Sequence, residues 1–200
     1  MIRFQDVKLA GAPPLLSLAF GGKGGWMAIK DLITVIPPPK KPRDAEGDWE
    51  KVESKLGITY PTDFRRLIKR YGTGEFLNGL LIYNPFNSWC FREIPKELET
   101  FRIMRDKMEI PLVIHPDEPG LFPWGHDVNG NNYCWMTEGK PNRWPVILLG
   151  HGYEDKPLRA DENITAFLAN YALNKHREMS GGIRFTKSQL RFVPGLTWEQ

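Results

Sequence analysis

The residues whose types and spacing most resemble a reactive or binding site lie between positions 127 and 138. Oxygen-bearing side chains fall there at positions 1, 3, 5, 7 and 12 of a calcium-loop pattern: Asp127, Asn129, Asn131, Tyr133 and Glu138. The sixth position, which requires glycine, is Asn132, and the residues that follow have the composition of a strand, which would separate the ligands. We therefore interpret the segment as a polar hairpin turn, in which Asn and Gly supply positive φ, and predict no metal site.

The histidines and cysteines are the other candidates for catalysis or zinc binding: His115, His126, His151, His176, Cys90 and Cys134. None of them stands at a close ligand spacing. A nucleophilic cysteine also needs a nearby base or helix N-terminus, and the sequence gives no sign of either. His115 precedes Asp117 and Glu118 in a segment that is typical of a solvated loop. We predict no catalytic residue and no cofactor.

Anion and nucleic-acid binding have weak support. The run Gly21-Gly22-Lys23-Gly24 resembles a phosphate-binding loop, but no Ser or Thr follows the lysine, so we interpret it as a flexible turn. The chain has 27 Lys and Arg against 24 Asp and Glu, and the nearest basic cluster, Lys40, Lys41 and Arg43, lies in a proline-rich linker. We expect no nucleic-acid partner, because such binding normally needs cations gathered on one face.

Two short helices are predicted at the start of the central region. Trp49, Val52 and Leu56 recur at helical spacing, and Gly57 follows at a position where a left-handed residue would end the helix. The second helix begins after Pro61, which pre-sets the helical φ. Asp63 stands near its N-terminus, where the helix dipole favours an acid. Its apolar residues Phe64, Leu67, Ile68 and Tyr71 share one face. Two apolar stripes this close in sequence are expected to pack together.

This order of motifs resembles the SUKH superfamily, the Smi/Knr-like domain shared by bacterial toxin-immunity proteins and fungal cell-wall regulators. The acid Glu53 in the first helix, the junction from Ile58 to Asp63 and the glycine after the second helix are similar to the opening motif of that family. The segment Leu121 to Gly130 resembles its later strand and polar turn. Tyr60 and Tyr71 depart from the usual residues. The resemblance covers about residues 44 to 173 and implies a structural role for these residues: Trp49, Glu53, Gly57, Pro61, Asp63, Phe64, Gly72, Pro123, Gly125, Asp127 and Gly130.

The composition fits one globular domain with appended segments. The chain has 200 residues, of which 41% are apolar and 12% aromatic, enough for a sizeable core. We predict an N-terminal extension and proline-rich linker over 1–43, the SUKH-like domain over 44–173, and a C-terminal strand or hairpin extension over 174–200. The apolar run from Leu9 to Phe20 is broken by prolines and is too short to span a membrane. With few cysteines as well, a cytoplasmic location is expected.

The predicted fold class is α+β, with a mostly antiparallel curved sheet and helices packed on one face. Ile94, Leu98, Phe101, Met104 and Met108 predict a further helix by their spacing, and a closing helix is expected over Ile164 to Tyr171. Strands are expected at these segments: Leu15 to Phe20, Leu32 to Ile36, Leu80 to Tyr83, Leu112 to His115, Leu121 to Trp124, Tyr133 to Met136 and Val146 to Leu149.

The resemblance implies a non-enzymatic protein that binds and occludes a cognate bacterial toxin. Alternatives are a regulatory interaction domain of the Smi/Knr type, or a small hydrolase or ligand-binding enzyme that uses His126, Asp127 or the cysteines. Aromatic and acidic side chains are our candidates for partner contact, because surface aromatic rings bury large areas at low entropic cost: Trp89, Glu93, Glu97, Trp124 and Trp135. The expected partner is a protein. The sequence leaves the oligomeric state open.

Overall fold

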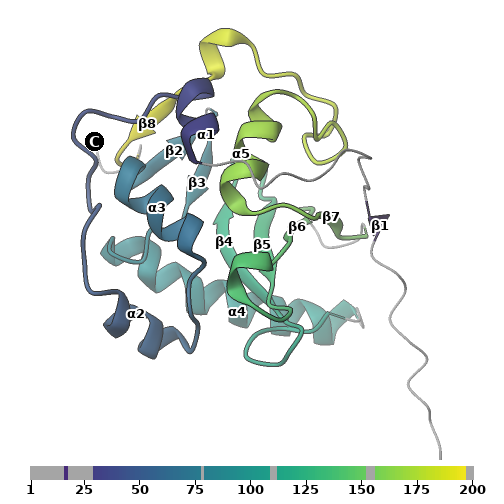
Figure 1. Cartoon of the computed structure of the whole chain (residues 1–200). Coiled ribbons are helices and arrows are strands. Elements are labelled where there is room, and N and C mark those ends of the chain that lie inside the picture. The colour runs from purple at the N-terminus through teal and green to yellow at the C-terminus, as the bar shows by residue number, and fades with distance from the viewer. Residues whose placement is uncertain (1–15, 18–28, 78, 109–111, 152–155, 197–200) are drawn as a thin grey trace, which may run out of the picture.

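The structure is a computed structural model that describes residues 16–17, 29–77, 79–108, 112–151 and 156–196. In this part of the chain, eight strands form one open sheet (Figure 1). Their spatial order is β1 (Leu16–Ser17), β7 (Leu158–Ala160), β6 (Val146–Leu149), β5 (Asn132–Met136), β4 (Leu121–His126), β3 (Leu80–Ile82), β2 (Gly74–Phe76) and β8 (Phe192–Pro194). Neighbouring strands are antiparallel except β1 and β7. The predicted α+β class with a mostly antiparallel sheet is confirmed.

Three helices pack together on one face of the sheet: α1 (Ile29–Val35), α3 (Thr62–Tyr71) and α5 (Ile164–Ala172) (Figure 1). Aromatic side chains of β4 and β5 form the layer beneath them. The ring of Trp135 lies 5.1 Å from Phe64 of α3, and that of Trp124 lies 6.0 Å from Phe167 of α5. Because strand side chains alternate between faces, this arrangement directs every second residue of β5 to the other side.

The long helix α4 (Ser88–Met108) covers that other side, where it packs against β4. Its buried residues Ile94, Leu98 and Phe101 stand at the spacing that predicted the helix, which confirms it. Cys134 of β5 points toward α4. Burial, and to a smaller extent the charge of Glu97 on α4, raise the pKa of the Cys134 thiol well above its usual value. The predicted layer of helices on one face of the sheet is present, and α4 adds a layer on the opposite face.

The segment before the proline-rich linker is helical, so the predicted strand at Leu32 to Ile36 is wrong. Its β-branched composition favours a strand, but Leu32 and Ile36 stand at i and i+4 and are completely buried, with α1 packed on α5. The carbonyl oxygen of Ile36 also accepts a hydrogen bond of 2.6 Å from the hydroxyl of Tyr71. Tertiary burial of the two residues therefore outweighs local strand propensity.

The two central helices begin and end as the sequence predicts. The α2 helix (Trp49–Leu56) is capped by Asp48, whose carboxylate accepts the N–H of Lys51 at 3.0 Å. It ends at Gly57, which has a φ of 65°. The rings of Trp49 and Phe64 lie 6.3 Å apart, so the two helical stripes meet. The α2 stripe is only partly buried, because this helix lies at the edge of the domain.

The remaining predicted strands have mixed outcomes. Strands occur within the segments predicted around Leu80, Leu121, Tyr133 and Val146. The predicted strand at 112–115 is reduced to one bridge between Ile114 and Leu121. Of the segment 15–20, only β1 lies within the described residues. The described residues also contain the 3-10 helices η1 (Pro141–Arg143) and η2 (Lys187–Gln189). Near the C-terminus, β8 pairs with β2.

Candidate functional site

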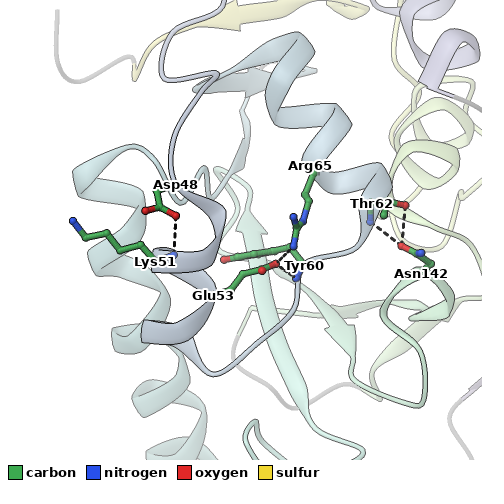
Figure 2. Close-up of polar contacts among 7 residues, drawn as sticks. All are labelled: Asp48, Lys51, Glu53, Tyr60, Thr62, Arg65 and Asn142. Atoms are coloured by element: carbon green, nitrogen blue, oxygen red, sulfur yellow. Dashed lines mark hydrogen bonds and ion pairs between the residues drawn. The ribbon is translucent and has the colours of Figure 1, made fainter.

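The acid of the first helix joins α2 to α3 (Figure 2). Oxygen Oε1 of Glu53 accepts the backbone N–H of Tyr60 at 2.6 Å and a guanidinium N–H of Arg65 at 2.5 Å. The side chains of Glu53 and Arg65 are 15% and 34% exposed, so the pair is partly shielded from water. The guanidinium also lies 5.2 Å from the ring of Trp49. These charge-assisted contacts fix the angle between the helices and occupy the carboxylate.

The beginning of α3 is held on its other side by polar contacts to distant segments. The amide oxygen of Asn142 in η1 accepts the backbone N–H of Thr62 at 2.7 Å (Figure 2). Asp63 accepts the N–H of Thr165 at 3.2 Å, near the N-terminus of α5. Burial raises the pKa of the Asp63 carboxyl despite the backbone N–H groups that lower it. Pro61 is buried at the start of the helix and Phe64 is completely buried. By accepting the N–H of Thr165, Asp63 orients α5 against α3.

The glycines of the motif stand where the backbone of another segment approaches closely. A Cβ at Gly72 would overlap the carbonyl oxygen of Arg43, and one at Gly125 would overlap that of Leu81. Pro123 and Gly125 flank an irregularity in the pairing of β4 with β5. Close packing of main chains therefore requires glycine at both positions.

The polar turn between β4 and β5 is organised by Asp127. One carboxylate oxygen accepts the backbone N–H groups of Asn129 at 2.9 Å and Asn131 at 3.1 Å. The other accepts the side-chain amide of Asn131 at 2.9 Å and the hydroxyl of Tyr133 at 3.2 Å. Gly130 has a φ of 80° and its N–H bonds to the Asp127 carbonyl. The hairpin turn is confirmed, but among its residues only Gly130, and no asparagine, has a positive φ. Within the described ranges, no group of three or more His, Cys, Asp or Glu side chains is arranged to hold a metal ion.

Beside this turn is a cavity of about 460 Å³, which we call the C-terminal recess. The turn 127–131 forms one wall, residues within 179–189 form another wall, and Tyr133 and Tyr171 also line the cavity. The two tyrosine hydroxyls lie 3.0 Å apart, and burial is the main cause that raises the pKa of each. The volume falls within the range of ligand-binding pockets.

An asparagine just after α5 is bonded to the wall 179–189. Asn174, with a φ of 60°, accepts the N–H of Phe185 at 2.7 Å and donates to its carbonyl oxygen at 3.3 Å. The ring of Phe185 also packs 5.2 Å from that of Tyr171. Sequence reasoning treated this segment as an extension and missed the recess. The asparagine followed by the glycine pair Gly181 and Gly182 was the available signal for a chain reversal.

A second polar cluster lies at the beginning of α4. The hydroxyl of Tyr83 lies 2.8 Å from Nδ1 of His126, and the ring of Trp89 lies 6.4 Å from the same histidine. Burial, then repulsion by Glu93, raise the pKa of the Glu97 carboxyl, while a hydrogen bond from Tyr83 lowers it. Burial lowers the pKa of His126, which nearby carboxylates partly offset. The cluster is acidic, aromatic and partly exposed.

Two of the residues predicted to contact a partner belong to the core. Trp124 and Trp135 are each 1% exposed, so the prediction that they meet a partner is wrong. Trp89, Glu93 and Glu97 are partly exposed and lie together on α4.

Cys90 and Cys134 are buried thiols, and the raised pKa of Cys134 keeps it protonated at neutral pH.

Comparison with known proteins agrees with these motifs. A family model described as SUKH_6, SMI1-KNR4 cell-wall, matches residues 46–168, which is more than half of the chain. No curated protein and no solved structure matches this chain. In the described part of the chain, no helix is long and apolar enough to cross a membrane. The chain therefore belongs to the SUKH family of SMI1-KNR4 type.

Proposed function

We propose that this protein is an immunity protein that binds and occludes a cognate bacterial toxin domain in the cytoplasm. Membership of the SUKH family, which includes immunity proteins, supports this proposal. The neutralising step is physical coverage of the toxin by a preformed surface, and it requires no turnover by this chain. The partner is recognised by shape and by complementary polar groups, which set specificity.

One observation carries the proposal: the polar side chains of the family motif are engaged within the chain. Glu53 joins two helices, Asp63 orients α5, and Asp127 organises a turn with four hydrogen bonds. These groups build a rigid frame, so recognition belongs to the side chains on the surface of that frame. A preformed frame reduces the entropy lost when a partner binds.

We place one contact region on α4 at the partly exposed residues that border its buried face. Trp89 supplies an aromatic anchor, and Glu93 and Glu97 supply negative charge beside it. Such a region fits a basic toxin surface, because an interfacial aromatic ring flanked by complementary charge combines buried area with orientation.

Co-expression with the gene adjacent to this one tests the proposal. We expect the neighbouring product to stop growth alone, the present chain to restore growth, and the two proteins to co-purify. Glu93→Lys combined with Glu97→Lys should weaken rescue, while the matched double reversal Glu46→Lys with Glu50→Lys, at exposed residues outside α4 and the recess, should not. A toxic neighbour that is neither bound nor neutralised would contradict the proposal.

The description of the matching family model also favours a second candidate, a regulatory interaction domain that acts on cell-wall assembly. Deletion of the gene in a strain that lacks the neighbouring toxin separates the two. Regulation predicts increased sensitivity to a cell-wall antibiotic in that strain, restored by the gene in trans. Immunity predicts unchanged sensitivity.

A further inference from the structure

The C-terminal recess offers an open apolar surface above polar groups that are already paired. The hydroxyl of Ser180 bonds to the carbonyl oxygens of Arg177 at 3.1 Å and Ile183 at 2.9 Å. The hydroxyl of Tyr133 bonds to Asp127, whose carboxylate accepts four hydrogen bonds in all. An entering group therefore does not need to satisfy these atoms, which favours an apolar occupant over a polar one.

The rim of the recess carries exposed hydrophobic side chains. Val128 is 76% exposed and Ile183 is 52% exposed, one on each wall, and both rank among the few large hydrophobic residues exposed in the described part of the chain. Exposed apolar side chains that line a cavity are typical of an anchor pocket in a protein interface.

None of the lining residues is a cation, but the cations that flank them in the sequence limit what can occupy the recess. The segment 175–191 carries five cations and one acid. Arg177, Arg184 and Lys187 are exposed and form no ion pair with any described residue. Solvated cations beside an apolar pocket attract an anionic partner and orient its approach. A second copy of this chain would bring the same cations together, so self-association through the recess is disfavoured.

We propose that the C-terminal recess binds an apolar side chain presented on an acidic segment of a protein partner. The apolar side chain enters between Val128 and Ile183, and carboxylates beside it meet the cations of the segment 175–191. The type of segment that the recess binds does not depend on the proposed function, whereas the identification of the partner as the toxin rests on it. This surface is opposite in charge to the region on α4, so one chain presents two distinct recognition surfaces.

Peptide titration of the full chain, followed by amide NMR shifts, tests the chemistry without a toxin. The probe is a capped Glu-Glu-Leu-Phe-Glu-Glu peptide, and the controls are Lys-Lys-Leu-Phe-Lys-Lys and Glu-Glu-Gly-Gly-Glu-Glu. We expect saturable shifts at Val128 and Ile183 with the probe alone, at millimolar concentration. Equal shifts with the basic peptide, or no shifts at the recess, would overturn the proposal.

The neighbouring toxin domain, in an inactive form, tests the partner by calorimetry with variants of the full chain. Ile183→Asp should weaken binding about tenfold or more, because it places a charge at an apolar contact and repels an acidic partner. Ile103→Asp is the matched control, at an isoleucine that is 42% exposed on α4. Arg184→Glu with Lys187→Glu should weaken binding and should also reduce the change of affinity with salt concentration.

The outcomes separate this inference from the proposed function. If the toxin binds the wild type and Ile183→Asp equally, the recess is not its dock, the inference fails for the toxin, and immunity stands. If the toxin does not bind at all, the proposed function fails and the peptide titration still decides the recess. Light scattering adds a further check, because a dimer that Ile183→Asp dissociates would identify a second copy as the occupant and overturn the proposal.

Discussion

The junction between α2 and α3 and the C-terminal recess use polar groups in opposite ways. At the junction, the carboxylate of Glu53 is occupied by the N–H of Tyr60 and the guanidinium of Arg65. At the recess, Arg184 and Lys187 remain solvated beside an exposed Ile183. The first region carries the family motif, whereas in the second the turn 127–131 lies within the matched range 46–168 and the wall 179–189 lies beyond it.

Under the two proposals above, the difference separates side chains that maintain the fold from side chains that recognise a partner. Groups that are engaged inside the chain maintain the frame, so their replacement is expected to lower the free energy of unfolding. Groups on the rim contribute little to folding, because exposed side chains away from special features usually change stability by less than about 0.5 kcal/mol. Binding measurements should give the opposite ranking.

The largest effect is expected at a glycine of the frame. In Gly72→Ala the new Cβ overlaps the backbone of Arg43, so we expect a loss of more than about 3 kcal/mol in urea unfolding, or failure to fold. Gly139→Ala is the control, since Gly139 has a similar φ, 66° against 69°, and open space around it. That variant should lose only about 1 kcal/mol. Equal losses would mean that φ, and not the close approach, dominates.

The next effect is expected at the helix junction. Glu53→Ala removes the acceptor of two hydrogen bonds and should lower the free energy of unfolding by about 2 kcal/mol. Glu50→Ala, at an exposed position of the same helix, should change it by less than about 0.5 kcal/mol. Urea denaturation measures both. Similar values for the two variants would show that the junction contributes nothing beyond a surface charge.

A smaller, pH-dependent effect is expected on α4. Burial raises the pKa of Glu97 above its usual value of 4.5, so the folded state holds its proton more tightly than the unfolded state. Ionisation therefore costs stability, and the cost develops as the pH rises from 4.5 through the folded-state pKa. Glu97→Gln removes the ionisation, so its stability relative to wild type should increase from pH 4 to pH 7. A flat difference in thermal unfolding would contradict this.

The smallest effect on folding is expected at the rim of the recess. Ile183→Asp and Ile103→Asp should each change the free energy of unfolding by less than about 0.5 kcal/mol, because both side chains are exposed. Urea unfolding of the two variants checks this. A large loss in Ile183→Asp alone would show that Ile183 stabilises the segment 179–189, and its effect on binding would then need a second rim variant, Val128→Asp.

Much of the frame was predictable because short-range patterns determine it. The apolar spacing of α2, α3 and α4, the left-handed Gly57 and the turn at Asp127 and Gly130 are all local features, and each occurs where the sequence predicts. Local propensity failed at α1, which is helical up to Val35 and packs against α5, with Leu32 completely buried. It also could not distinguish core tryptophans from surface ones, since burial depends on neighbours distant in sequence.

The amino-acid sequence by itself determined the family, the order of the central elements and the positions at which helices begin and end, because capping and periodicity act within a few residues. Only the tertiary structure decided which carboxylates are engaged and where a recess opens. Glu53 meets Arg65 across a helix junction, and Asp127 comes to face the segment 179–189 when Asn174 turns the chain. Such contacts depend on the packing of the whole sheet, so local patterns do not encode them.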